Sequence, residues 1–68
     1  MSRYIVSETI YVIHNDKVCE AVVLDVEGYP EDTIYKVRLW SDEVLLYTEW
    51  GIYQDKDSAQ RRLDFRNI

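Results

Sequence analysis

The single histidine and the single cysteine of this chain are the first residues to consider for chemistry. His14 and Cys19 flank a short turn-forming stretch, and an imidazole beside a thiol can act as base and nucleophile. Cys19, however, stands in an apolar segment, where a cysteine usually behaves as a small hydrophobic residue. The sequence places no third residue in an obvious position to orient the pair. It therefore predicts no catalytic residues and a protein that is not an enzyme.

Three acidic pairs could supply oxygen ligands to a hard cation. They are Glu31-Asp32, Asp42-Glu43, and Asp55 with Asp57. The first two pairs lie in predicted turns and the third at a predicted helix start, and the stretch after Asp55 lacks the glycine and the distal glutamate of a calcium loop. With two glycines in the chain, a glycine-rich phosphate loop is also absent. We therefore predict no metal site and no cofactor.

Composition and charge limit the possible classes of protein. The chain has 68 residues, of which 47% are hydrophobic, which predicts one small folded domain over residues 1–68. Its formal net charge of -5 argues against nonspecific nucleic-acid binding, which depends on Lys and Arg neutralising phosphates. One cysteine excludes an internal disulfide. We find neither a membrane-spanning apolar run nor a signal-peptide pattern, so we expect a cytoplasmic protein.

Apolar alternation predicts the elements that would position these side chains. We expect strands over about 8–13, 18–26, 33–40, 44–50 and 52–53, and a helix over about 56–65. Asn15-Asp16 suits the positive φ angles of a tight hairpin turn. The segment 18–26 is apolar on both sides for part of its length, which predicts strong curvature or a bulge.

The hairpin formed by 33–40 and 44–50 carries the clearest alternation. An even-length loop between these strands predicts six residues that face the core in three cross-strand pairs. These pairs are Leu39 with Val44, Val37 with Leu46, and Tyr35 with Thr48, and the same register turns Trp50 inward.

The predicted helix has a recognisable start and a packing stripe. Asp55 is the expected N-cap, and Ala59 and Leu63 lie four residues apart on one side. Three arginines follow toward the carboxyl end, where positive charge is favoured by the helix dipole. A helix this short must dock on the sheet to be stable.

Together these elements predict a mainly β fold: a small five-stranded SH3-like barrel with one short C-terminal helix covering an open end of the core. The chain resembles a class of very short bacterial and phage proteins that share an SH3-like, or Tudor-like, small barrel with a terminal helix. The resemblance is carried by four segments: Ile10-Tyr11-Val12-Ile13, Val18-Cys19-Glu20-Ala21-Val22-Val23, Ile34-Tyr35-Lys36-Val37, and Gly51-Ile52-Tyr53 with Gln54 to Leu63. It implies the fold and assigns no function, because small barrels host many unrelated activities.

The outer face of the same hairpin is the predicted binding site. The register sets Lys36 opposite Tyr47 and Arg38 opposite Leu45, with Ile34 and Trp40 at the flanks. Such basic and aromatic surfaces bind extended peptides or other partners through stacking and cation–π contacts. We therefore expect a non-enzymatic binding module that contacts a protein partner or a second copy of itself. The alternative is that these are ordinary cross-strand pairs on a solvated sheet.

Other ligands are compatible with the same sequence. A bacterial or phage protein could sequester a small anionic, nucleotide-like ligand with arginine side chains. The candidate arginines are Arg38, Arg61, Arg62 and Arg66. Nucleic acid is less favoured because of the net charge. An aromatic cage for methylated side chains could be built from Tyr29, Trp40, Tyr47 and Trp50, although the expected register turns Trp50 away from Tyr47.

Overall fold

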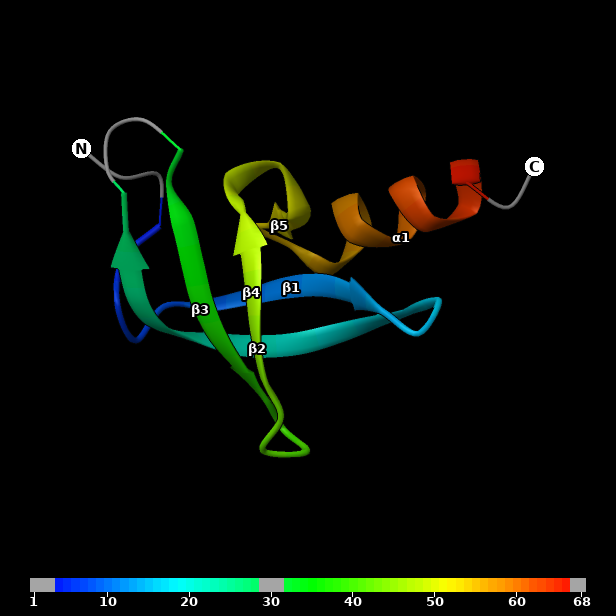
Figure 1. Cartoon of the computed structure of the whole chain (residues 1–68). Helices are drawn as coiled ribbons and strands as arrows, with labels where there is room; N and C mark the ends of the chain where they lie inside the picture. Colours follow the sequence, from blue (N-terminus) through cyan, green and yellow to red (C-terminus); the bar gives the residue numbers. More distant parts are fainter. Residues whose placement is uncertain (1–3, 29–31, 67–68) are drawn as a thin grey trace.

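The computed structural model describes residues 4–28 and 32–66 of the chain (Figure 1). Five antiparallel strands form one curled sheet, a half-barrel, and one helix follows them. The elements are β1 (Thr9–His14), β2 (Lys17–Glu27), β3 (Ile34–Leu39), β4 (Val44–Thr48), the 3₁₀-helix η1 (Glu49–Gly51), β5 (Ile52–Tyr53) and α1 (Lys56–Arg66). The expected fold class, mainly β with a C-terminal helix, is confirmed. The expected fourth strand is wrong at its end, because residues 49 and 50 belong to η1.

The strand order of the sheet is β4-β3-β2-β1-β5. Strands β1 to β4 form a meander, and β5 crosses over to pair with β1 at the other edge. The long strand β2 pairs with β1 through its first half and with β3 through its second half. Its register to β3 shifts between Val23 and Asp25, so Leu24 is the extra residue of a β-bulge. The bulge bends β2 and lets one strand serve both halves of the sheet, as the two-sided apolar pattern predicts.

The tight turn between β1 and β2 also agrees with the sequence. Asn15 and Asp16 have φ angles of 53° and 60°, and His14 pairs with Lys17 across the two-residue loop. Positive φ at both central residues is the geometry whose twist matches that of the flanking strands.

The hydrophobic core lies on the concave side of the sheet. Strands β1, β2, β3 and β5 contribute buried residues to it, and β4 packs the partly buried Leu45 and Tyr47 against it. The fully buried side chains include Ile10, Val12, Val23, Tyr35 and Val37. Tyr4, which precedes β1, is also buried, with 3% of its surface exposed. Its ring packs edge-on against Tyr35 with 5.5 Å between centroids, and its hydroxyl donates to the Ile52 carbonyl at 3.1 Å. Tyr4 therefore ties β3 to β5 inside the half-barrel.

Helix α1 begins where the sequence predicts. The backbone N–H of Ser58 donates to Asp55 Oδ1 at 2.7 Å, so Asp55 is the N-cap. Ala59 and Leu63 are the buried residues of the helix, and α1 packs against β1, β2 and β5.

The expectation that the helix covers an open end of the core needs correction. Ala59 and Leu63 are not members of the concave core cluster. The start of α1 instead borders a hollow lined by Tyr11, Val18, Glu20 and Lys56. Tyr11 and Glu20 are a cross-strand pair on the side of the sheet opposite Ile10 and Val12, because successive side chains alternate. The helix therefore covers the outer side of β1 and β2.

Candidate binding surface

The β3–β4 hairpin has a register one residue away from the expected one. Val37 pairs with Leu45 and Tyr35 with Tyr47. The predicted core partners Val44, Leu46 and Thr48 are exposed instead. This part of the prediction is wrong, although Tyr35, Val37 and Leu39 are buried as expected.

The cause of this shift is the length of the turn. The Leu39 N–H donates to the Glu43 carbonyl and the Asp42 N–H donates to the Leu39 carbonyl, both at 2.9 Å. Asp42 takes a left-handed φ of 69°. The loop is therefore Trp40-Ser41-Asp42, a three-residue hairpin loop with its last residue in the left-handed region. Because side chains alternate with a period of two, an odd loop in place of an even one turns every β4 side chain to the other face.

On the observed outer face, the β3 residues of the predicted site are present and its β4 residues are replaced by others. Lys36 pairs with Leu46, and Arg38 pairs with Val44. Leu45 and Tyr47, predicted to lie on this face, point to the concave side and pack against the core. We call the observed surface the outer patch, and it consists of Ile34, Lys36, Arg38, Trp40, Val44 and Leu46.

The apolar members of the outer patch are strongly exposed. Trp40 is 74% exposed, Leu46 66% and Val44 49%. The Trp40 indole N–H donates to Glu20 Oε2 on β2, which holds the ring over the outer side of the sheet. This hydrogen bond leaves most of the indole surface in water.

Trp50 borders the outer patch rather than facing the core. It lies in η1 with 78% of its surface exposed, so the prediction that it turns inward is wrong. It lines a hollow of about 370 Å³ together with Asp32, Thr33, Ile34, Thr48 and Glu49. Through Ile34 this hollow is continuous with the outer patch. Of the proposed aromatic cage, Tyr47 faces the concave side and Tyr29 lies outside the described residues.

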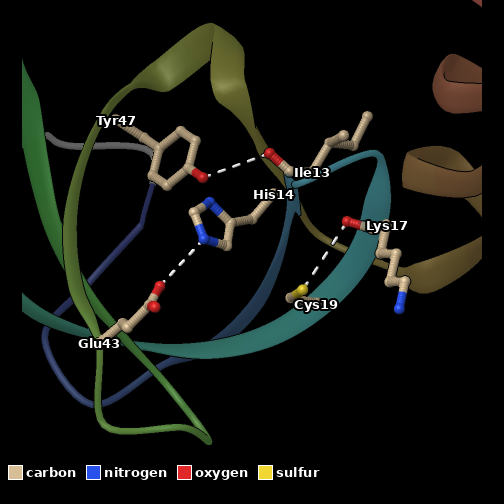
Figure 2. Close-up of polar contacts among 6 residues, drawn as sticks. All are labelled: Ile13, His14, Lys17, Cys19, Glu43 and Tyr47. Atoms are coloured by element: carbon tan, nitrogen blue, oxygen red, sulfur yellow. Dashed lines mark hydrogen bonds and ion pairs between the residues drawn. The ribbon is translucent and has the colours of Figure 1, made fainter.

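A polar cluster joins β1 to the β3–β4 hairpin on the concave side (Figure 2). The His14 imidazole Nε2 lies 2.9 Å from Glu43 Oε2, and the Tyr47 hydroxyl donates to the Ile13 carbonyl at 3.3 Å. Burial raises the pKa of the Tyr47 phenol above 10.0, and the negative charges that Cys19 and Glu43 can carry raise it further. These contacts hold β4 near β1.

Glu43 is the residue that contacts the His14 imidazole. The sequence analysis did not identify it as a third member of the His14–Cys19 pair. The thiol of Cys19, however, donates to the Lys17 carbonyl at 3.7 Å, and the imidazole is engaged by Glu43. His14 and Cys19 share the concave face as diagonal neighbours on paired strands. The His14–Glu43 contact connects β1 to the β3–β4 hairpin, and the Cys19–Lys17 hydrogen bond lies within β2. Neither His14 nor Cys19 lines the hollow beside Trp50 or the one beside Lys56. The only sequence signal for Glu43 was its place beside a hairpin turn.

The four arginines of the alternative anionic site are all exposed. Arg38 lies on β3, while Arg61, Arg62 and Arg66 lie on α1, which packs against β1, β2 and β5. Arg61 Nη2 donates to Ser58 Oγ at 3.5 Å within the helix. Neither of the two hollows described above is lined by an arginine.

The acidic pairs have structural positions. Asp42 and Asp32 have left-handed φ angles, and Asp55 caps α1, while Glu31 lies outside the described residues. The hydrogen bonds from the Ser58 backbone and side chain lower the pKa of the Asp55 carboxyl below its ordinary value. Across residues 4–28 and 32–66 no group of three or more His, Cys, Asp or Glu side chains is arranged to hold a metal ion.

Comparisons with known proteins give no relative for this chain. No protein family, no curated protein and no solved structure matches it. In the described part of the chain no helix is long and apolar enough to cross a membrane.

Proposed function

We propose that this chain is a non-enzymatic binding module that contacts a protein partner through the outer patch. The observation that carries the proposal is the exposure of Trp40, Leu46 and Val44 on one sheet face. The energetically dominant residues of protein interfaces are enriched in Trp and Arg, and the outer patch offers both types. Several large apolar side chains exposed on one face of a small domain are typical of an interaction surface.

The charges of the outer patch define what kind of partner fits. Lys36 and Arg38 are the two central residues of its β3 half and are exposed, whereas the chain as a whole carries a net charge of -5. A partner with apolar side chains and a carboxylate at its rim would bury the aliphatic stems and pair with the guanidinium. Nucleic acid is a poor fit, because two basic residues in a chain of net negative charge can neutralise few phosphates. Neither of the two hollows described above is lined by an arginine, so we propose protein binding in preference to an arginine-based ligand site.

The test compares two charge reversals at exposed arginines. Arg38→Glu combined with Trp40→Ala removes the basic and aromatic centre of the outer patch, and Arg62→Glu on α1 is the matched control. Proteins retained from a lysate of the host cell by each immobilised variant are identified by mass spectrometry. The affinity of each purified candidate is then measured by calorimetry.

We expect a candidate that binds the unchanged protein and the Arg62→Glu control equally, and binds the outer-patch variant at least about tenfold more weakly. Equal binding to all three proteins would show that the outer patch is not the site. Binding that weakens with Arg62→Glu alone would move the site to α1. None of the three substituted residues belongs to β4 itself.

A further inference from the structure

Strand β4 is a terminal strand of the sheet without the usual protection against pairing. Among the described residues it pairs only with β3. Its five residues, Val44-Leu45-Leu46-Tyr47-Thr48, include no charge, no proline and no glycine, and its ladder with β3 has no bulge. Natural edge strands usually carry a lysine, a proline or a bulge because an open edge is a template for another strand.

The hydrogen-bond pattern shows which groups of β4 face the open edge. The Leu39 N–H donates to the Glu43 carbonyl, so this opposed pair is a hydrogen-bonded one. In an antiparallel ladder such pairs alternate with non-bonded pairs, and the next bonded pairs are Val37–Leu45 and Tyr35–Tyr47. The backbone N–H and C=O groups of Val44, Leu46 and Thr48 therefore point away from β3.

We propose that a second copy of the chain pairs with this edge, β4 against β4, in antiparallel orientation about a two-fold axis at Leu46. Leu46 then lies opposite Leu46 of the second copy, and Val44 lies opposite its Thr48. This register uses every outward-pointing backbone group of the strand on both copies. A two-fold contact requires a surface that is complementary to itself. Strand β4 meets that requirement because it is uncharged, and because its side chains alternate between the two faces in the same way when the strand is read from either end.

The concave side gives an independent reason for this register. Leu45 and Tyr47 pack against the core but are only half-buried, while their β3 partners Val37 and Tyr35 are fully buried. In the proposed register Leu45 lies opposite Tyr47 of the second copy. The added strand would therefore cover the part of the core that this small chain leaves partly open.

The charges near the edge tolerate the pairing. The two Lys36 side chains would be separated by two β4 strands, about 14 Å apart, which exceeds the Debye length at physiological salt. The proposed register places Glu43 opposite Glu49 of the second copy. Both residues lie outside the β4 ladder, Glu43 before Val44 and Glu49 in η1, and Glu43 Oε2 is already held 2.9 Å from His14 Nε2. Strand β5 has two residues, so a head-to-tail contact between β4 and β5 offers a shorter ladder.

The first test places a charge on the edge and asks whether the protein becomes monomeric. Leu46→Lys puts two ammonium groups opposite each other at the axis, and like charges in that position destabilise a strand pair. Leu24→Lys, at another exposed leucine of the outer side, is the control. Sedimentation velocity over a concentration series should show a dimer for the unchanged protein and the control, with dissociation at least about tenfold easier for Leu46→Lys.

The second test determines the register between the two β4 strands, and it does not require the Leu46→Lys variant to fold. In a Cys19→Ser background, Leu46→Cys should form an intermolecular disulfide under mild oxidation, because directly opposed bonded residues have Cα atoms about 5.5 Å apart. Val44→Cys should stay unlinked, since the stagger separates the two copies of position 44 by about 13 Å. A monomer at all concentrations, a ring of more than two copies, or equal crosslinking at both positions would overturn the proposal. These outcomes are independent of whether Arg38→Glu affects a different partner.

Discussion

Tyr47 shows how a single side chain can connect two strands that are not neighbours in the sheet. Its hydroxyl reaches from β4 to the Ile13 carbonyl on β1. Tyr47→Phe keeps the ring and removes this bond, so we expect the free energy of unfolding at neutral pH to fall by about 1 kcal/mol. Urea denaturation measures it, with Tyr53→Phe as the control, since its hydroxyl makes no hydrogen bond within residues 4–28 and 32–66.

The raised pKa of the Tyr47 phenol gives this prediction a pH dependence. The folded state favours the protonated phenol more than the unfolded state does, so the stabilisation is complete below pH 10 and lost as the pH rises through the raised pKa. The difference between the unchanged protein and Tyr47→Phe should therefore shrink at alkaline pH. A difference that stays constant there, or an equal loss with Tyr53→Phe, would contradict this role for Tyr47.

At the scale of the elements, the start of α1 depends on the Asp55 carboxylate. Asp55→Ala removes the acceptor of the Ser58 N–H and should lower the melting temperature by several degrees. Asp55→Asn keeps an acceptor and loses the charge, so it should cost less. Thermal unfolding followed by circular dichroism measures both variants.

The contribution of Asp55 to the stability of the fold should also depend on pH in the acidic range. Because the pKa of the folded carboxyl is lowered, its stabilisation is present above the ordinary aspartate range and is lost as the pH falls through the lowered value. Asp55→Asn should therefore flatten part of the acid limb of the stability curve. An acid limb identical in all three proteins would show that the cap carries no titrating stabilisation.

The elements differ in how far the sequence predicts them. Strand and helix limits follow from alternation, from the Asn15-Asp16 turn and from the Asp55 cap, because these signals are local. The register of the β3–β4 hairpin depends on one backbone choice at Asp42, and no local pattern distinguishes a three-residue loop from a four-residue one. Two of the six residues of the expected site, Leu45 and Tyr47, were therefore assigned to the wrong face. Lys36 and Arg38 were placed correctly because β3 alternates without ambiguity.

At the scale of the whole molecule, Tyr4 completes the core from outside the regular strands. It is isolated in a stretch without periodicity, so no sequence pattern marks it as buried. Its ring packs against Tyr35 and its hydroxyl binds the Ile52 carbonyl. Tyr4→Ala should cost about 3–5 kcal/mol, a large part of what a domain of this size possesses.

Tyr4→Phe is the matched variant, and it should cost about 1 kcal/mol because only the hydroxyl is removed. Urea denaturation and near-ultraviolet circular dichroism distinguish the two outcomes. If Tyr4→Ala were as stable as Tyr4→Phe, the ring would contribute little and the half-barrel would be closed by other residues.

The hydrogen bond between the Tyr4 hydroxyl and the Ile52 carbonyl joins positions 48 residues apart, so it forms late during synthesis on the ribosome. The hairpins β1–β2 and β3–β4 can form as soon as they emerge, but the nascent chain cannot close its core before Ile52 leaves the exit tunnel. Until then the concave side of four strands stays open to water. Non-local closure of this kind slows folding and lengthens exposure to aggregation, so chaperones that bind emerging apolar chains would encounter this protein with the concave side of its four strands exposed.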